Sequence, residues 1–123
     1  MVGDITLKEN SSIWHGVILR GDQAAIQIGR NSMIQDNSRL GSNSGSGKIN
    51  IGDNVFVGAN ARLEDCELES FAYVGMGASV GKGATVESFA VLAAGAQLAD
   101  GETVPTGQVY AGAPAKYLRD LSQ

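Results

Sequence analysis

The chain has 123 residues, of which 43% are apolar, 18% charged and only 6% aromatic, as expected for one globular domain. A net charge of −4 with scattered basic residues excludes a nucleic-acid footprint, and the lone cysteine, Cys66, excludes an intrachain disulfide and a cysteine-based metal cage. We expect no membrane span and no targeting signal, because no apolar run approaches ~20 residues and the first residues, MVGDITLKE, match neither a signal peptide nor a transit peptide.

The N-terminal third carries apolar residues at every sixth position, in two runs. The break between the runs, at residues 22–25, predicts a short bulge. A polar stretch that ends this region, residues 42–48 (SNSGSGK), predicts a loop. The six apolar positions are Leu7, Ile13, Leu19, Ile28, Ile34 and Leu40.

The longest run of the same repeat begins at Ile51, with one five-residue step after Leu63. A period of six fits neither a helix nor a single strand, but it fits short strands joined by tight turns. Glycine, asparagine and aspartate, as in Gly52-Asp53-Asn54, suit the strained turn positions. The repeated apolar positions are Ile51, Val57, Leu63, Leu68, Val74, Val80, Val86, Leu92, Leu98, Val104 and Tyr110, and small residues precede most of them by two, namely Val55, Ala61, Ala72, Ala78, Ala84, Ala90 and Ala96.

Together these repeats predict an all-β fold, a single-stranded left-handed parallel β-helix with three hexapeptides per coil, over residues 1–115. Coils of eighteen residues would stack at ~4.8 Å around a column of aliphatic side chains, which explains the scarcity of aromatic residues. Such a coil is an exception to the right-handed crossover rule. After the two prolines, residues 116–123 (KYLRDLSQ) predict the start of a C-terminal α-helix.

Several stretches, in order, resemble the γ-class carbonic anhydrases. Residues 12–22 (SIWHGVILRGD) resemble the family pattern S-I-W-x-x-A-V-L-R-G-D, and residues 34–36 (IQD) resemble the end of N-I-Q-D. Residues 51–55 (IGDNV) and 112–116 (GAPAK) also occur in this family. The resemblance covers essentially the whole chain. It implies a trimer with metal sites in the clefts between prisms, and a longer C-terminal helix, of which residues 116–123 would be a truncated beginning.

The resemblance also implies three histidine ligands, which this chain lacks. Aligned on Gln35, the first ligand position is Gly41, and aligned on residues 57–58 the others are Ala59 and Glu64. Glycine and alanine offer no ligand, and a single carboxylate does not make a tight catalytic zinc site. We therefore expect that this chain has lost its metal site and binds no cofactor, while zinc remains an option for partner subunits.

Other positions of the family pattern are retained. By resemblance, Arg20 and Asp22 pair across the subunit boundary and Gln35 lies near the metal-bound species. We expect Trp14 at the trimer interface as well. The expected interface residues are retained while the metal ligands are absent. This combination favours a protein that still assembles into trimers but is not catalytic.

The expected function is therefore a non-catalytic γ-carbonic-anhydrase-like structural subunit of a homo- or heterotrimer. Its partners would be homologous subunits within a large membrane-associated complex. Histidine-poor relatives of this kind belong to the matrix side of the membrane arm of mitochondrial respiratory complex I, so the resemblance implies a mitochondrial, inner-membrane location.

Two other classes of function remain open at this stage. An active enzyme would be either a carbonic anhydrase that uses unconventional ligands such as Glu64, or a hexapeptide-repeat acyltransferase with His15, the only histidine, as its base. A scaffold in another assembly, such as a cytoskeletal motor adaptor, is the third option. Cys66 is expected to be a packed thiol.

Overall fold

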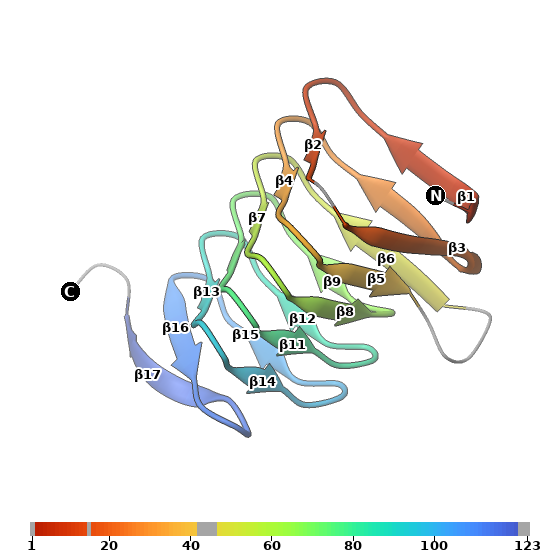
Figure 1. The fold of residues 1–123 in the computed structure, drawn as a ribbon. Helices are drawn as coiled ribbons and strands as arrows, with labels where there is room; N and C mark the ends of the chain where they lie inside the picture. Colours follow the sequence, from red (N-terminus) through yellow and green to blue (C-terminus); the bar gives the residue numbers. More distant parts are fainter. Residues whose placement is uncertain (1, 15, 42–46, 121–123) are drawn as a thin grey trace.

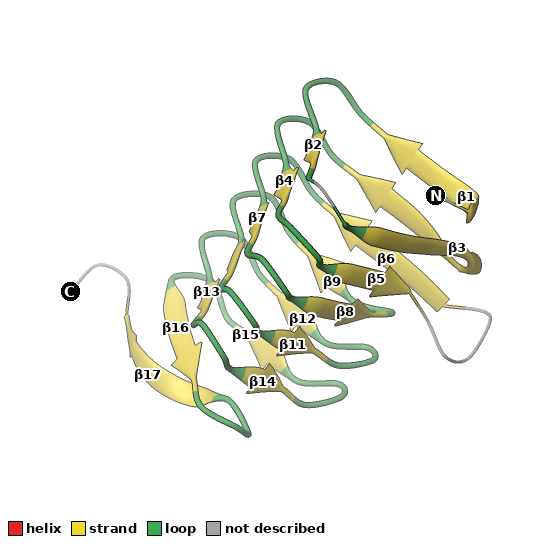
Figure 2. Ribbon diagram, viewed as in Figure 1, coloured by secondary structure: helices red, strands yellow, loops and turns green. Residues whose placement is uncertain are grey.

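The computed structural model describes residues 2–14, 16–41 and 47–120, and this part of the chain is all-β. It is a left-handed parallel β-helix in which successive coils stack into a three-sided prism (Figures 1 and 2). In this part, the strands complete five turns and begin a sixth. The described residues include no helix long and apolar enough to cross a membrane. The predicted fold class is confirmed.

Three faces make up the prism, and each face is a ladder of strands from successive coils. Face A consists of β1 (Val2–Leu7), the second half of β3 (Ile18–Ile28), β6 (Gly47–Ile51), β9 (Glu67–Leu68), β12 (Thr85–Val86) and β15 (Thr103–Val104). Face B consists of β2 (Ser12–Ile13), β4 (Met33–Ile34), β7 (Phe56–Val57), β10 (Tyr73–Val74), β13 (Val91–Leu92), β16 (Gln108–Ala111) and β17 (Lys116–Asp120). Face C consists of the first half of β3, β5 (Arg39–Gly41), β8 (Arg62–Glu64), β11 (Ser79–Val80) and β14 (Gln97–Leu98).

The register of the strands places the predicted apolar positions in one buried column. Val74 pairs with Leu92, one coil later, and the five-residue step is absorbed where Leu63 pairs with Val80. From Ile28 to Val104 the repeated apolar residues are buried, and so are the small residues two positions before them. At two corners serine takes the place of the small residue: the Ser32 Oγ donates to the Gly52 carbonyl at 2.6 Å and the Ser38 Oγ to the Gly58 carbonyl at 2.8 Å.

At the described corners that join separate strands of the prism, the chain turns on a residue with positive φ, three positions before the inward residue of the next strand. Most of these residues are glycine or asparagine, as the turn prediction requires; Asn31 and Asn54 are examples. Three corners depart from this rule. One carries Asp65, with φ of 39°, and the other two carry the bulky Phe71 and Phe89, with φ of 66° and 61°. A bulky residue in this region costs on the order of 1 kcal/mol or more, so these two corners are strained.

Two predicted boundaries change in the structure. The expected bulge at residues 22–25 agrees with a register shift, since Gly3 pairs with Gly21 but Ile5 pairs with Ile26. The expected loop 42–48 is wrong at its end, because residues 47–48 belong to β6 and pair with residues 24–25. Pairing with β3 outweighs the loop tendency of glycine there. Residues 42–46 lie outside the described part.

The predicted C-terminal helix is wrong over residues 116–120, which form β17 antiparallel to β16. Strand addition satisfies the open backbone groups at the edge of face B, whereas a helix of so few residues closes too few hydrogen bonds to be stable. The rings of Tyr110 and Tyr117 pack edge to face at 6.4 Å across this pair. Residues 121–123 lie outside the described part.

Glycine at the close contacts between coils is expected to be irreplaceable. A Cβ at Gly75 would meet the Ala94 nitrogen at 2.4 Å, which is backbone and cannot rotate away, so Gly75→Ala should cost about 2 kcal/mol or more in urea unfolding. At Gly77 a Cβ would meet nothing within 4 Å and only φ is restrictive, so Gly77→Asn is the matched control, with a loss of about 0.5 kcal/mol or less. Equal losses at the two positions would contradict the close approach of neighbouring coils at Gly75.

Candidate functional site

Two of the three expected ligand positions lie side by side on face C. Gly41 ends β5, Glu64 ends β8, and the two residues are partners in register. Ala59 lies elsewhere, on the corner between β7 and β8, where its carbonyl accepts a hydrogen bond from the Gly77 nitrogen at 2.8 Å. All three residues are partly exposed. The fold thus presents Gly41 and Glu64 as one pair and Ala59 as a separate position at the corner.

The chemistry of these positions is poor for a metal. Among the described residues no group of three His, Cys, Asp or Glu side chains could hold an ion. Glu64 lines a polar groove on face C together with Arg62, Ser79, Gln97 and Asp100. Glycine and alanine contribute no donor atom, so Glu64 is the one ligating side chain of the expected set.

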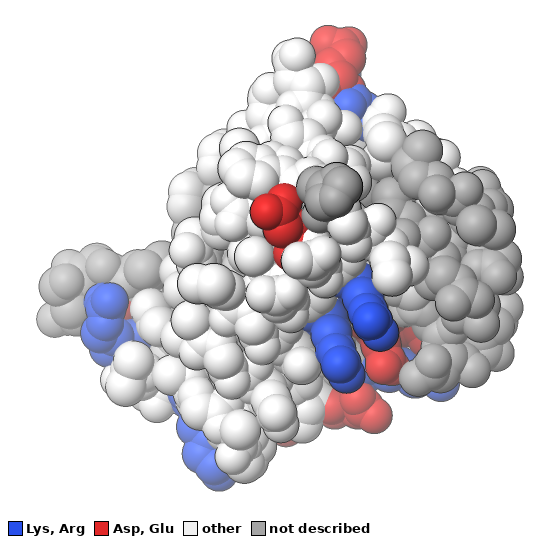
Figure 3. All heavy atoms as spheres, viewed as in Figure 1, with Lys and Arg blue, Asp and Glu red and all other residues white. Residues whose placement is uncertain are grey.

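Two arginines flank this pair, and sequence reasoning had not singled them out. Arg39 and Arg62 begin β5 and β8, are partners in register, and are both exposed. Figure 3 shows two basic side chains side by side over these two strands. Like charges on neighbouring strands repel each other and also repel a divalent cation. The sequence does indicate where these side chains point. Arg39 and Arg62 each stand one residue before an inward leucine, Leu40 or Leu63, and neighbouring residues of a strand point to opposite sides.

The remaining predicted site residues are distributed over different faces. Trp14 follows β2 on face B and is 46% exposed, with its nitrogen bonded to the Ile34 carbonyl at 2.9 Å. Gln35 also lies on face B, partly buried, and its nitrogen bonds to the Val57 carbonyl at 3.0 Å. Residues 20–22 lie in β3, but the side chains of Arg20 and Asp22 are outside the described part, as is His15. The interface roles of Trp14, Arg20 and Asp22 and the role of Gln35 therefore stay predictions.

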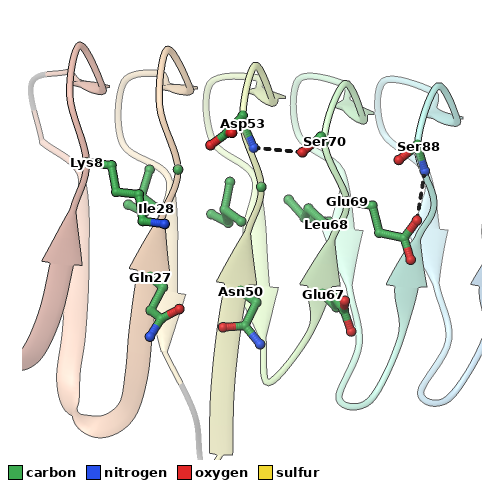
Figure 4. A pocket seen from close by; sticks show the side chains of 13 residues that line it. Lys8, Gln27, Ile28, Asn50, Asp53, Glu67, Leu68, Glu69, Ser70 and Ser88 are labelled. Atoms are coloured by element: carbon green, nitrogen blue, oxygen red, sulfur yellow. Dashed lines mark hydrogen bonds between the residues drawn. The ribbon is translucent and has the colours of Figure 1, made fainter.

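A second groove of the described surface lies on face A and is lined mostly by polar residues. Gln27, Asn50 and Glu67 lie in a row along it, one from each of three neighbouring strands (Figure 4). Hydrogen bonds join successive coils nearby: the Asp53 nitrogen donates to the Ser70 Oγ at 3.1 Å and the Ser88 nitrogen to the Glu69 Oε1 at 3.2 Å (Figure 4). These contacts hold the stack of coils together and do not assemble a nucleophile beside a base.

The thiol of Cys66 is expected to be unreactive in the folded protein. It fills a corner position of the core at 3% exposure, and burial, with Asp65 adding to it, raises the pKa of its thiol to about 12. Since the thiolate is the reactive form, labelling by a disulfide reagent at pH 8 should be at least about a hundredfold slower than in the urea-unfolded chain. Cys66→Ala, which places the usual corner residue there, is the blank. Equal labelling rates in the folded and unfolded chains would contradict the burial of Cys66.

The raised pKa of Cys66 also has a consequence for stability. The folded state favours the neutral thiol, so this contribution is fully present below the ordinary thiol pKa of 9.0 and is lost as pH rises toward about 12. The Cys66→Ala variant should therefore lose less stability between pH 9 and pH 11 than the parent chain.

Comparison with known proteins found no matching protein-family model. Among curated proteins, the chain is 48% identical over 126 residues to "Gamma carbonic anhydrase 3, mitochondrial" of Arabidopsis thaliana, covering 98% of this chain and 49% of that protein. It is 42% identical over 123 residues to a "Probable carbonic anhydrase" of Methanocaldococcus jannaschii, covering 100% of this chain and 77% of that protein. The chain thus spans about half the length of the plant relatives it matches.

Among solved structures, a hexapeptide transferase family protein from Anaplasma phagocytophilum matches with a TM-score of 0.90 and 41% identity. The match covers 96% of this chain and 69% of that one. This agreement extends along nearly the whole prism, so the fold and the order of the coils are shared.

Proposed function

Because the chain belongs to the γ-carbonic anhydrase family of hexapeptide-repeat proteins, we propose that it is a non-catalytic, structural subunit of a γ-carbonic-anhydrase-like trimer. One observation carries this proposal: Gly41 and Glu64 are adjacent in register on face C, Ala59 lies on the corner that precedes Glu64 in the same coil, and none of the three is a histidine.

Catalysis by zinc needs three protein ligands and an open position for water, whose pKa the metal lowers. This chain offers one carboxylate, Glu64, with the guanidinium groups of Arg39 and Arg62 at the start of the same two strands. The loss of two donors weakens metal binding, and the two positive charges weaken it further. The chain would therefore bind no cofactor, and zinc in an assembly would be held by partner subunits.

The same reasoning bears on the composition of the trimer. A site shared between two neighbouring chains fails if either chain lacks its ligands, so this subunit would disable both clefts that it borders. In a heterotrimer only the cleft between two other, histidine-bearing chains would keep a working site. In a homotrimer no site would remain.

The location of the trimer is the finer part of the proposal. We place it on the matrix side of the membrane arm of mitochondrial respiratory complex I, because a relative with 48% identity is named as mitochondrial and a chain that has lost its ligands suits a structural subunit. Epitope-tagged chain in its native cells should fractionate with inner mitochondrial membranes and migrate on native gels with NADH dehydrogenase activity. A cytosolic trimer free of that complex would overturn the location but leave the non-catalytic role intact.

An active enzyme is the competing function, and Glu64 is the residue that favours it, because it lines the face C groove with Ser79 and Gln97. In that case CO₂ hydration or acetyl transfer should be measurable and should vanish in Glu64→Ala or His15→Ala. A chain without either activity supports the structural role.

A further inference from the structure

Face C carries four hydrogen-bond donors in one outward column. Arg39, Arg62, Ser79 and Gln97 are partners in register on β5, β8, β11 and β14, one from each of four successive coils. Neighbouring members of the column are separated by the strand spacing of about 4.8 Å. The first two members, which we name the arginine pair, are both exposed and lie side by side (Figure 3).

The fold does not require arginine at these two positions. The same outward position is neutral on the next two coils, where it is Ser79 and Gln97, and apolar on the preceding one, where it is Ile18. Like charges directly opposite each other on neighbouring strands destabilise a sheet. Within residues 2–14, 16–41 and 47–120, no ion pair or hydrogen bond engages either guanidinium group of the arginine pair. In a chain with a net charge of −4, two adjacent positive charges kept in this way indicate an anionic ligand.

A groove leads away from the arginine pair along the same column. Its volume of about 510 Å³ lies in the range of small-molecule sites, and Arg62 and Ser79 line it. Two carboxylates line it as well: Glu64, two residues after Arg62 on β8, and Asp100, whose Oδ1 accepts a hydrogen bond from the Lys82 nitrogen at 2.9 Å. Asp100 lies two coils beyond Arg62, about 10 Å along the prism. The positive end of the groove is therefore the end at the arginine pair.

We propose that the arginine pair binds a phosphate group, either free or as the terminal group of a small molecule whose remainder lies in the groove. Each guanidinium group presents a planar fork of N–H donors that matches two phosphate oxygens. A phosphate group carries nearly two negative charges near neutral pH, so one group compensates both arginines, whereas a carboxylate compensates only one. The hydroxyl of Ser79, on the next coil, is a further donor beside them. This site uses none of the three expected ligand positions of the metal, so the inference stands whether or not the chain is catalytic.

Titration of the full chain with inorganic phosphate, at low ionic strength and pH 8, tests the proposal. Calorimetry should show one phosphate per chain with a Kd of about 1 mM or tighter. Phosphate should also raise the Tm, because a ligand that binds only the folded state stabilises it. Arg39→Gln with Arg62→Gln should weaken phosphate binding at least about tenfold. Without phosphate, the Tm of this variant should equal or exceed that of the parent chain, because the repulsion between the two arginines is gone.

A matched control separates the site from net charge. Arg30→Gln with Arg119→Gln removes two positive charges from exposed positions away from face C. It should bind phosphate within about twofold of the parent chain, because charges beyond the Debye length are screened. Glu64→Gln should tighten phosphate binding about threefold, since it removes a repelling carboxylate beside the arginine pair.

A second ligand distinguishes the two sources of the phosphate group. A sugar phosphate such as ribose 5-phosphate that binds more tightly than inorganic phosphate, and loses this advantage in Gln97→Ala, places the remainder of the molecule in the groove. Equal Kd values for the two ligands assign the site to free phosphate.

Three results would overturn the proposal. The first is no heat and no change in Tm when phosphate is added to the parent chain. The second is an equal loss of phosphate binding in the Arg30→Gln, Arg119→Gln control. The third comes from sedimentation: a parent trimer that dissociates on Arg39→Gln with Arg62→Gln, with no effect of phosphate, would assign the arginine pair to carboxylates of a neighbouring subunit.

Discussion

A chain carrying Gly41→His, Ala59→His and Glu64→His is expected to bind zinc, whereas we predict that the parent chain binds none. The first and third substitutions place two imidazoles side by side, since residues 41 and 64 are partners in register on face C. The third imidazole would come from the corner residue 59, as the family's shared sites require. Three imidazoles and a water complete the tetrahedral set of a catalytic zinc. The affinity should rise by at least about a thousandfold, which corresponds to about 4 kcal/mol.

Zinc content after dialysis and isothermal titration measure this gain, and the three single histidine variants are the controls. Each single variant leaves at least two positions without an imidazole, so none should retain zinc. Adding Arg39→Gln and Arg62→Gln to the triple variant should tighten binding further, because two positive charges leave the neighbourhood of the site. A triple variant that still failed to retain zinc would mean that these residues do not occupy the family's ligand positions.

Truncation of an inward leucine is expected to cause the largest loss of stability. Leu92 has no exposed surface and pairs with Val74 on one side and Tyr110 on the other, so Leu92→Ala leaves a cavity between coils. The free energy of unfolding should fall by about 2–5 kcal/mol in urea titration. The matched control is Val91→Ala, its outward neighbour on β13, with a loss of about 1 kcal/mol or less. Similar losses at both positions would contradict the assigned inside and outside of face B.

Much of this fold follows from the repeat alone, because one apolar residue in six defines both the strand and the side of it that is buried. The repeat identifies Leu63 and Val80 as inward residues even though a five-residue step lies between their strands. Both residues are buried, and they pair in register. The repeat also predicts that Asn54 turns a corner, which its φ of 58° confirms.

The features that sequence reasoning missed depend on contacts between coils. Phenylalanine is unfavourable at positive φ, so no local rule predicts Phe71 and Phe89 at corners. The stacking of their rings depends on how successive coils pile up in the fold. Residues 116–120 have an apolar pattern that suits a helix, but pairing with β16 decides their conformation. On face C, the pairing of Arg39 with Arg62 joins residues 23 positions apart in the chain, a spacing that the insertion before β6 shifts away from eighteen.

The central claim is that this chain keeps the β-helix fold of its family but binds no catalytic zinc and does not hydrate CO₂. Zinc content and CO₂ hydration, measured together on the purified chain after refolding in excess zinc, test it most directly. We predict no stoichiometric zinc and hydration at the rate of the buffer alone. One zinc per chain, with a hydration rate that Glu64→Ala abolishes, would contradict the account.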